Sequence, residues 1–163
     1  MTRLITSFFG AGFLPIAPGT WGSAAAIPVA VGIYALGGFF ALLAATLIVF
    51  FIGLWAVQQR TVGMADPDLS EIVIDEVAGQ WVALFPLAGG LWWLGSNLTW
   101  LPWPGLLFAF IFFRLFDILK PYPCNLLDRM KTPFGVMADD IMAGIYAALV
   151  TAISGAIGHG LAG

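Results

Sequence analysis

Two pairs of adjacent acidic residues stand where long apolar runs begin: Asp75-Glu76 before Val77–Leu94, and Asp139-Asp140 before Ile141–Gly158. Capping explains one acid of such a pair at most, because a helix has a single N-cap residue. A charged side chain at the centre of a bilayer costs about 2.5–3.5 kcal/mol. Carboxylates beside apolar runs are therefore expected near an interface, with a cation as partner.

The acids upstream of the first pair have a simpler explanation. Asp66, Asp68 or Ser70 is expected to cap a helix, and acids such as Glu71 complement the helix dipole in its first turn. A helix that begins there places the first acidic pair beyond its first turn. Capping then does not account for the pair.

Each acidic pair is followed about one helical turn later by a glycine, Gly79 or Gly144. Small residues let membrane helices approach closely, so two helices that cross at these glycines would bring all four carboxylates together. An all-oxygen cluster suits Mg²⁺ or another hard cation. The candidate metal ligands, also candidate catalytic groups, are Asp75, Glu76, Asp139 and Asp140.

A third group of charges ends another apolar run. Arg114, Asp117 and Lys120 share one face of a helix because they are spaced by three residues. An Arg–Asp ion pair and a lysine that reaches toward the interface are the structural explanations. The functional interpretation makes Arg114 a fork-shaped phosphate ligand and Lys120 a point charge near the phosphate. Asp117 is then a catalytic residue that either binds the metal or orients its neighbours.

The glycine-rich segment Gly10–Ser23 is a weaker candidate for phosphate binding. Thr20 and Ser23 could open a helix whose N–H groups bind an anion, although the lysine-bearing pattern of a phosphate loop is absent. Cys124 lacks surrounding glycines and is expected to be inert. The single histidine, His159, lies at the far end of the last run, which argues against a phosphohistidine.

Composition places these residues in a membrane protein. Of 163 residues, 61% are hydrophobic and 9% are charged, with a mean hydropathy of +0.98, whereas soluble domains carry about 25% charged residues. The formal net charge of −3 argues against a nucleic-acid partner. The length suits a single domain, residues 1–163.

The apolar runs predict an all-α, polytopic membrane bundle of about four to five helices. They are Ser23–Leu36, Phe39–Val57, Val77–Leu94, Gly105–Leu119 and Ile141–Gly158. The first run is short and contains Pro28, so it either spans the bilayer or is re-entrant. The segment before it reads as a loop rich in glycine and proline.

The charged residues predict the topology. They fall in three groups, Arg3 alone, Arg60–Glu76 and Arg114–Asp140, and the stretches between these groups carry no charge. If the runs cross out and back as hairpins, every charge lies on one side, which the basic residues in short segments make cytoplasmic. Tryptophans gather around the opposite turn, as in an aromatic belt: Trp92, Trp93, Trp100 and Trp103.

Together these segments resemble the phosphatidylglycerophosphatase A family of bacterial membrane lipid phosphatases, from about Gly10 to Gly144. The resemblance rests on four ordered motifs: Gly12-x-x-Pro15-x-Ala17-Pro18-Gly19-Thr20-x-Gly22-Ser23, Asp66-Pro67 followed by Val73-Ile74-Asp75-Glu76-x-x-Gly79, Phe113-Arg114-x-Phe116-Asp117-x-x-Lys120-Pro121-x-Pro123, and Gly135-Val136-Met137-x-Asp139-Asp140-x-x-Ala143-Gly144. One departure is Thr132-Pro133, which replaces a Gly-Gly pair of the family and stiffens a turn without removing a reactive side chain.

The resemblance implies Mg²⁺-dependent removal of the terminal phosphate from phosphatidylglycerophosphate, which yields phosphatidylglycerol and inorganic phosphate. It also implies an all-helical bundle around a central helix in the bacterial inner membrane, with the site facing the cytoplasm. The expected partners are the lipid substrate and membrane lipids. The substrate's tails would stay in the bilayer while its phosphates meet the charged residues at the interface.

Two other functional classes use similar residues. A small transporter or channel also places ionisable residues in a hydrophobic bundle, but it should carry charges at mid-span or matched polar residues on both sides. A head-group transferase uses the same metal chemistry with an alcohol acceptor, but it needs its own spaced aspartate signature. The sequence has neither feature, and release of phosphate distinguishes the three classes.

Overall fold

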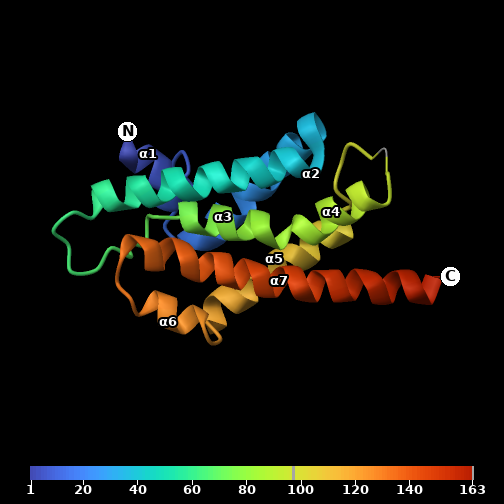
Figure 1. Cartoon of the computed structure of the whole chain (residues 1–163). Coiled ribbons are helices and arrows are strands. Elements are labelled where there is room, and N and C mark those ends of the chain that lie inside the picture. The colour runs from blue at the N-terminus through green and yellow to red at the C-terminus, as the bar shows by residue number, and fades with distance from the viewer. Residues whose placement is uncertain (97, 163) are drawn as a thin grey trace.

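The computed structural model describes residues 1–96 and 98–162, apart from the side chains of residues 157–162, so the side chain of His159 lies outside the described residues. The described residues form helices and loops without a strand, which confirms the predicted all-α class (Figure 1). In chain order the elements are α1 (Thr2–Thr6), the 3-10 helix η1 (Ala11–Phe13), α2 (Pro18–Arg60), α3 (Ile74–Ala83), α4 (Phe85–Trp93), α5 (Trp103–Leu119), α6 (Cys124–Asp128) and α7 (Pro133–Ala162).

Helix α2 folds back on itself at Gly38, whose φ of 65° and ψ of −156° are open essentially to glycine alone. The first arm, residues 18–37, packs on α3, where Trp81 Nε1 donates a hydrogen bond of 2.9 Å to the carbonyl of Ala26. An arm of this length measures about 30 Å, the thickness of a hydrocarbon core. The run Ser23–Leu36 therefore lies in an arm long enough for a complete span.

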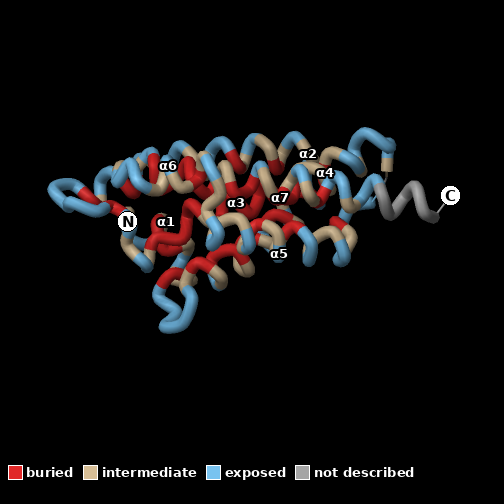
Figure 2. The backbone as a smooth tube through the Cα atoms, turned by 90° about the horizontal axis from the view of Figure 1, so that it is seen from below, coloured by how far each residue is buried: buried red, intermediate tan, exposed pale blue. Residues whose placement is uncertain are grey.

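Helix α3 is the most enclosed element, since α2, α5 and α7 pack around it and nearly all its residues are buried (Figure 2). It meets α7 backbone to backbone. A Cβ atom at Gly79 would lie 2.5 Å from the carbonyl oxygen of Asp140 and 2.5 Å from the ring of Phe113, and one at Gly144 would collide with the Gly79 carbonyl. The expected crossing at these two glycines is confirmed.

The predicted start of α3 is wrong. The helix begins at Ile74, so Asp66, Asp68 and Ser70 lie in the preceding loop and cap no helix. Asp66 Oδ1 instead accepts the N–H of Asp68 at 3.1 Å, a local turn that competes with helix formation. The first acidic pair consequently stands in the first turn of α3 and not beyond it, where the helix dipole favours negative charge.

The predicted start of α7 is also wrong. The helix begins at Pro133, because proline suits the first helical position, so Asp139 and Asp140 lie inside it and neither is an N-cap. The N-terminal segment differs from its predicted loop as well, since it contains the short helices α1 and η1.

The outer faces of the bundle are apolar. Large hydrophobic side chains are exposed along α2, α5 and α7, among them Phe51, Ile111 and Leu149. Two helices are long and apolar enough to cross a membrane, α2 and the Pro133–Ala156 part of α7, which indicates membrane association.

The two ends of the bundle differ in chemistry. At one end Glu71 forms ion pairs with both Arg3 and Arg60, which ties the N-terminus to the loop after α2. At the other end the α2 turn lies against α4, where the rings of Phe39 and Trp92 stack with centroids 6.3 Å apart. The loop before α3 and helix α6, which contain charged residues, thus lie at the opposite end of the bundle from the α2 turn and α4 (Figure 1).

The backbone contact at Gly79 yields a prediction about stability. Gly79→Ala should destabilise the protein by about 1–3 kcal/mol, because the Asp140 carbonyl and the Phe113 ring must move. Gly90→Ala is the matched control, since a Cβ there meets nothing within 4 Å and a helical alanine gains about 0.5–1 kcal/mol. Thermal unfolding in detergent measures both; equal stabilities for the two variants would contradict the close contact.

Candidate metal and phosphate site

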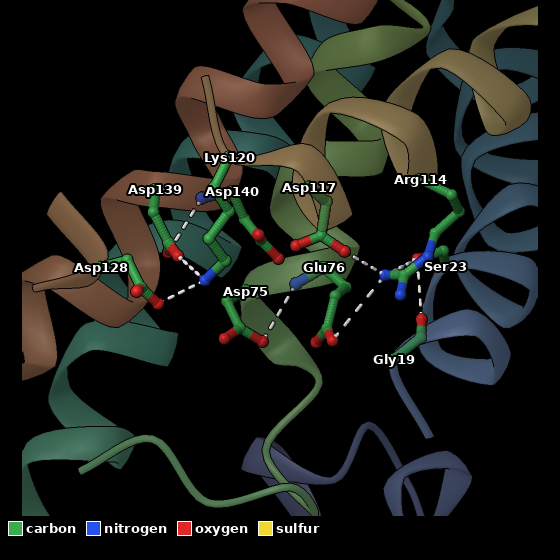
Figure 3. Close-up of polar contacts among 10 residues, drawn as sticks. All are labelled: Gly19, Ser23, Asp75, Glu76, Arg114, Asp117, Lys120, Asp128, Asp139 and Asp140. Carbon is green, nitrogen blue, oxygen red and sulfur yellow. Dashed lines mark hydrogen bonds and ion pairs between the residues drawn. The ribbon is translucent and has the colours of Figure 1, made fainter. Parts of the chain in front are cut away.

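A cavity of about 290 Å³ opens at the charged end of the bundle, between the N-terminal parts of α3 and α7 and the C-terminal end of α5 (Figure 3). Its lining is mostly charged: Asp68, Asp75, Glu76, Arg114, Asp117, Lys120, Asp128, Lys131, Asp139 and Asp140, with the apolar Ile118 and Val136. The cavity thus gathers acidic and basic side chains from α3, α5, α6 and α7 and from the segments that connect the helices.

Asp75 and Glu76 from α3 and Asp140 from α7 form a three-carboxylate group, whose potential ligand oxygens all lie within 4.8 Å of one another. Asp75 and Asp140 are only 7% and 4% exposed. Glu76 Oε2 is buried and has no hydrogen-bond partner among the described residues. Like charges this close and this buried repel one another strongly, so a cation bound among them would stabilise the group.

Asp139, the neighbour of Asp140, contacts a lysine and stands outside the three-carboxylate group. Its Oδ2 accepts a hydrogen bond of 2.7 Å from Lys120 Nζ, which also contacts Asp128 at the end of α6. Burial opposes the charge of Lys120, but the two carboxylates outweigh it and raise the pKa of the ammonium above its ordinary value. Lys120 is therefore a permanent positive charge on the cavity wall.

Arg114 connects the carboxylates to the first arm of α2. Its Nη1 lies 2.5 Å from Asp117 Oδ2 and 4.0 Å from Glu76 Oε1, and donates a hydrogen bond of 3.4 Å to Ser23 Oγ. Ser23 Oγ in turn donates to the carbonyl of Gly19 at 2.8 Å. The guanidinium is thus held beside the three-carboxylate group (Figure 3).

Gly19 permits this approach of α2 to the site. A Cβ atom there would lie 3.2 Å from Arg114 Nη1 and would collide with the carboxylate of Glu76. Thr20, the other candidate of this segment, is half-buried in the first turn of α2 and makes no side-chain hydrogen bond in the described part of the chain. The structure brings Ser23 into contact with the site residues, whereas Thr20 contacts none of them through a hydrogen bond.

Three charged residues of the cavity were missing from the sequence-based site candidates: Asp68, which was expected only to cap a helix, Asp128 and Lys131. Asp128 reaches Lys120 only because the chain turns after α5 and forms α6, which returns its last residue to the cavity. Lys131 lies in the turn before α7 and pairs with Asp66 of the loop before α3. Neither pairing follows a helical or strand period that the sequence could reveal.

Cys124 is unsuited to nucleophilic chemistry. Its thiol is buried in α6, and burial raises its pKa above the ordinary value, so the reactive thiolate is disfavoured. Cys124 does not line the cavity either.

Comparison with known proteins assigns a family. The family model for phosphatidylglycerophosphatase A matches residues 4–154. Two proteins named phosphatidylglycerophosphatase A are similar: one from Haemophilus influenzae, 36% identical with 91% of this chain and 85% of that protein covered, and one from Escherichia coli, 34% identical with 90% and 78% covered.

A third relative has a different name. The protein from Bacteroides thetaiotaomicron, named "Putative phosphatidylinositol-3-phosphatase", is 36% identical, with 93% of this chain and 91% of that protein covered. No solved structure shows a significant match.

Metal binding can be tested without any activity. Mg²⁺ should raise the melting temperature, because a ligand present at 100 times its Kd stabilises the folded state by about 2.7 kcal/mol. Asp75→Asn, Glu76→Gln and Asp140→Asn should each abolish most of this increase, since each removes a charged ligand of the three-carboxylate group. Asp68→Asn, which removes a charge from the same cavity outside the group, should retain it. If Mg²⁺ raised the melting temperature of the first three variants as much as that of the parental protein, metal binding by these three carboxylates would be contradicted.

Proposed function

The chain belongs to the phosphatidylglycerophosphatase A family, and from this premise we propose that it is a metal-dependent membrane phosphatase acting on phosphatidylglycerophosphate. The reaction hydrolyses the terminal phosphate monoester and releases phosphatidylglycerol and inorganic phosphate. The observation that carries the proposal is the three-carboxylate group beside Arg114 and Lys120 in one cavity.

The donor set fits a hard divalent cation. It offers carboxylate oxygens without thiolate or imidazole, which suits Mg²⁺, and the unpartnered Glu76 Oε2 is an oxygen available for coordination. We assign Asp75, Glu76 and Asp140 as ligands. When bound, Mg²⁺ supplies Lewis-acid polarisation of phosphoryl oxygens.

The chain's own cations provide the remaining electrostatic stabilisation. Arg114 presents a planar fork of N–H donors that matches phosphate oxygens, and Lys120 adds a second positive charge. Negative charge that develops on the phosphoryl group in the transition state is stabilised by such preorganised donors.

The partners of these two cations act by positioning. Asp117 and Ser23 fix the Arg114 guanidinium, while Asp139 and Asp128 hold Lys120. Asp139, a candidate metal ligand by sequence, therefore serves in this proposal to position Lys120. Thr20 stays a candidate for phosphate contact through its place in the first turn of α2.

The same geometry supports a proposal for the membrane arrangement. We propose a multi-pass protein of the bacterial inner membrane, in which the two arms of α2, α5 and α7 cross the bilayer around the central α3–α4 pair. The ion pairs that join the N-terminus, the loop before α3 and the α6 region place the charged segments at one end, which we assign to the cytoplasm. A substrate with its tails in the bilayer presents its phosphates there.

The substrate assignment distinguishes this chain from one relative. The Bacteroides protein is named for a different lipid phosphomonoester, so its name makes phosphatidylinositol 3-phosphate the appropriate comparison substrate. Phosphate release should be faster from phosphatidylglycerophosphate. Measurement of phosphate release also distinguishes a phosphatase from a transporter, which releases no phosphate, and from a head-group transferase, which requires an alcohol acceptor.

The roles of the carboxylates lead to a prediction about turnover. Asp75→Asn, Glu76→Gln and Asp140→Asn should each reduce phosphate release on the order of 10²-fold or more, a barrier increase of about 2.7 kcal/mol. Excess chelator should abolish turnover of the parental protein, because its ligands are oxygens that bind a hard cation. Phosphate release in detergent micelles is the measurement.

The control for these variants is Asp68→Asn, which should keep turnover close to the parental rate because Asp68 lies outside the three-carboxylate group. Near-parental rates in all three neutral variants, or full turnover in chelator, would show that the carboxylates are structural.

The topology is tested by labelling from each side of the membrane. On a Cys124→Ser background, Ser96→Cys should react with an impermeant maleimide in intact spheroplasts, because it follows α4 at the tryptophan-rich end. Arg129→Cys, next to α6 at the charged end, should react only after permeabilisation. Labelling of both positions from the same side would refute the proposed orientation.

A further inference from the structure

Three cationic side chains line the cavity, and one of them is held differently from the others. Arg114 and Lys120 each face two carboxylates. Lys131 forms an ion pair with one carboxylate among the described residues, Asp66, whose Oδ2 lies 2.8 Å from its Nζ, while Asp68 and Asp128 attract it from farther away. Lys131 belongs to the cavity lining and Asp66 does not.

The Lys131–Asp66 ion pair is the weaker arrangement. The two side chains are 46% and 50% exposed, whereas those around Arg114 are 13–17% exposed. Exposed ion pairs contribute about 0–1 kcal/mol, so an anionic ligand in the cavity can replace Asp66 at small cost. Asp66 would then keep its hydrogen bond from the Asp68 N–H.

The backbone holds Lys131 in place at the edge of the cavity. Its φ is 49°, in the left-handed region that costs a non-glycine residue about 1–2 kcal/mol, and α7 begins two residues later. Lys120, the other lysine of the cavity, also has a left-handed φ of 43°. Glycine would relieve both strains, but it carries no ammonium group.

The substrate of the proposed function has a second anion that the assigned groups leave without a partner. Its terminal monoester is assigned to the three-carboxylate group, Arg114 and Lys120. Its inner phosphodiester lies one glycerol away, between the monoester and the lipid tails. On the basis of the proposed function, we propose that Lys131 binds this phosphodiester and exchanges Asp66 for it.

The exchange makes Lys131 a specificity-determining residue for lipids that carry both a monoester and a neighbouring diester. The product phosphatidylglycerol keeps the diester and lacks the monoester, whereas inorganic phosphate resembles the monoester alone. Each ligand therefore reports on one part of the cavity.

The experiment compares the binding of these two ligands to the purified full chain with Mg²⁺ present. Lys131→Gln should weaken the Kd for short-chain phosphatidylglycerol about five- to ten-fold and leave the Kd for inorganic phosphate within about two-fold, because only the diester loses a charged partner. In turnover, the KM for phosphatidylglycerophosphate should rise while kcat changes little. Asp66→Asn should tighten phosphatidylglycerol binding about two-fold, since it frees Lys131.

Arg129→Gln is the matched control. Arg129 is exposed, lies two residues before Lys131 and does not line the cavity, so the substitution removes a nearby positive charge without changing the cavity. It should change neither Kd. The proposal is overturned if Lys131→Gln leaves phosphatidylglycerol binding unchanged, if it weakens both ligands equally, or if Arg129→Gln has the same effect. A parental protein that releases no phosphate from phosphatidylglycerophosphate would instead refute the proposed function, while the two Kd values would still decide whether Lys131 binds a diester.

Discussion

Three carboxylates held together at the end of an apolar bundle impose the constraint on which the remaining structure depends. Asp75, Glu76 and Asp140 repel one another in a site where two of them are almost fully buried. In its ionised form such a group requires compensating positive charge. The first turn of α3 supplies part of it through the helix dipole, and Arg114 supplies more. A bound divalent cation would add to this compensation and would supply the Lewis acid of the proposed reaction.

The packing of the helices determines where this group lies. Gly79 and Gly144 let α3 and α7 touch through their backbones, which brings Asp140 next to the first turn of α3. The first arm of α2 approaches from the other side, where Gly19 leaves room for Glu76 and Arg114. The surrounding cations are then positioned by acids outside the group. The cavity lining still has seven carboxylates against three cationic side chains, and this excess of negative charge favours a bound divalent cation.

The sequence predicted the all-helical class, the crossing at Gly79 and Gly144, and the shared face of Arg114 and Asp117, because each follows a local spacing. It could not predict which acid of an adjacent pair faces the other helix, since neighbouring residues on a helix point about 100° apart. In the structure Asp139 pairs with Lys120, whereas Asp140 belongs to the three-carboxylate group with Asp75 and Glu76. The helix starts were misplaced because a local turn at Asp66 and the proline at position 133 outweighed the capping signals. The pairings of Lys120 with Asp128 and of Lys131 with Asp66 depend on the positions of α6 and of the loop before α3, which tertiary packing determines.

We propose that a divalent cation binds among Asp75, Glu76 and Asp140. Crystals grown or soaked with Mn²⁺, which substitutes for Mg²⁺ at oxygen sites and scatters anomalously, test this proposal most directly. We expect an anomalous peak coordinated by oxygens of these three residues, with Asp139 still paired to Lys120. A well-ordered cavity without a peak at this position, or a peak coordinated elsewhere in the charged end of the bundle, would contradict it.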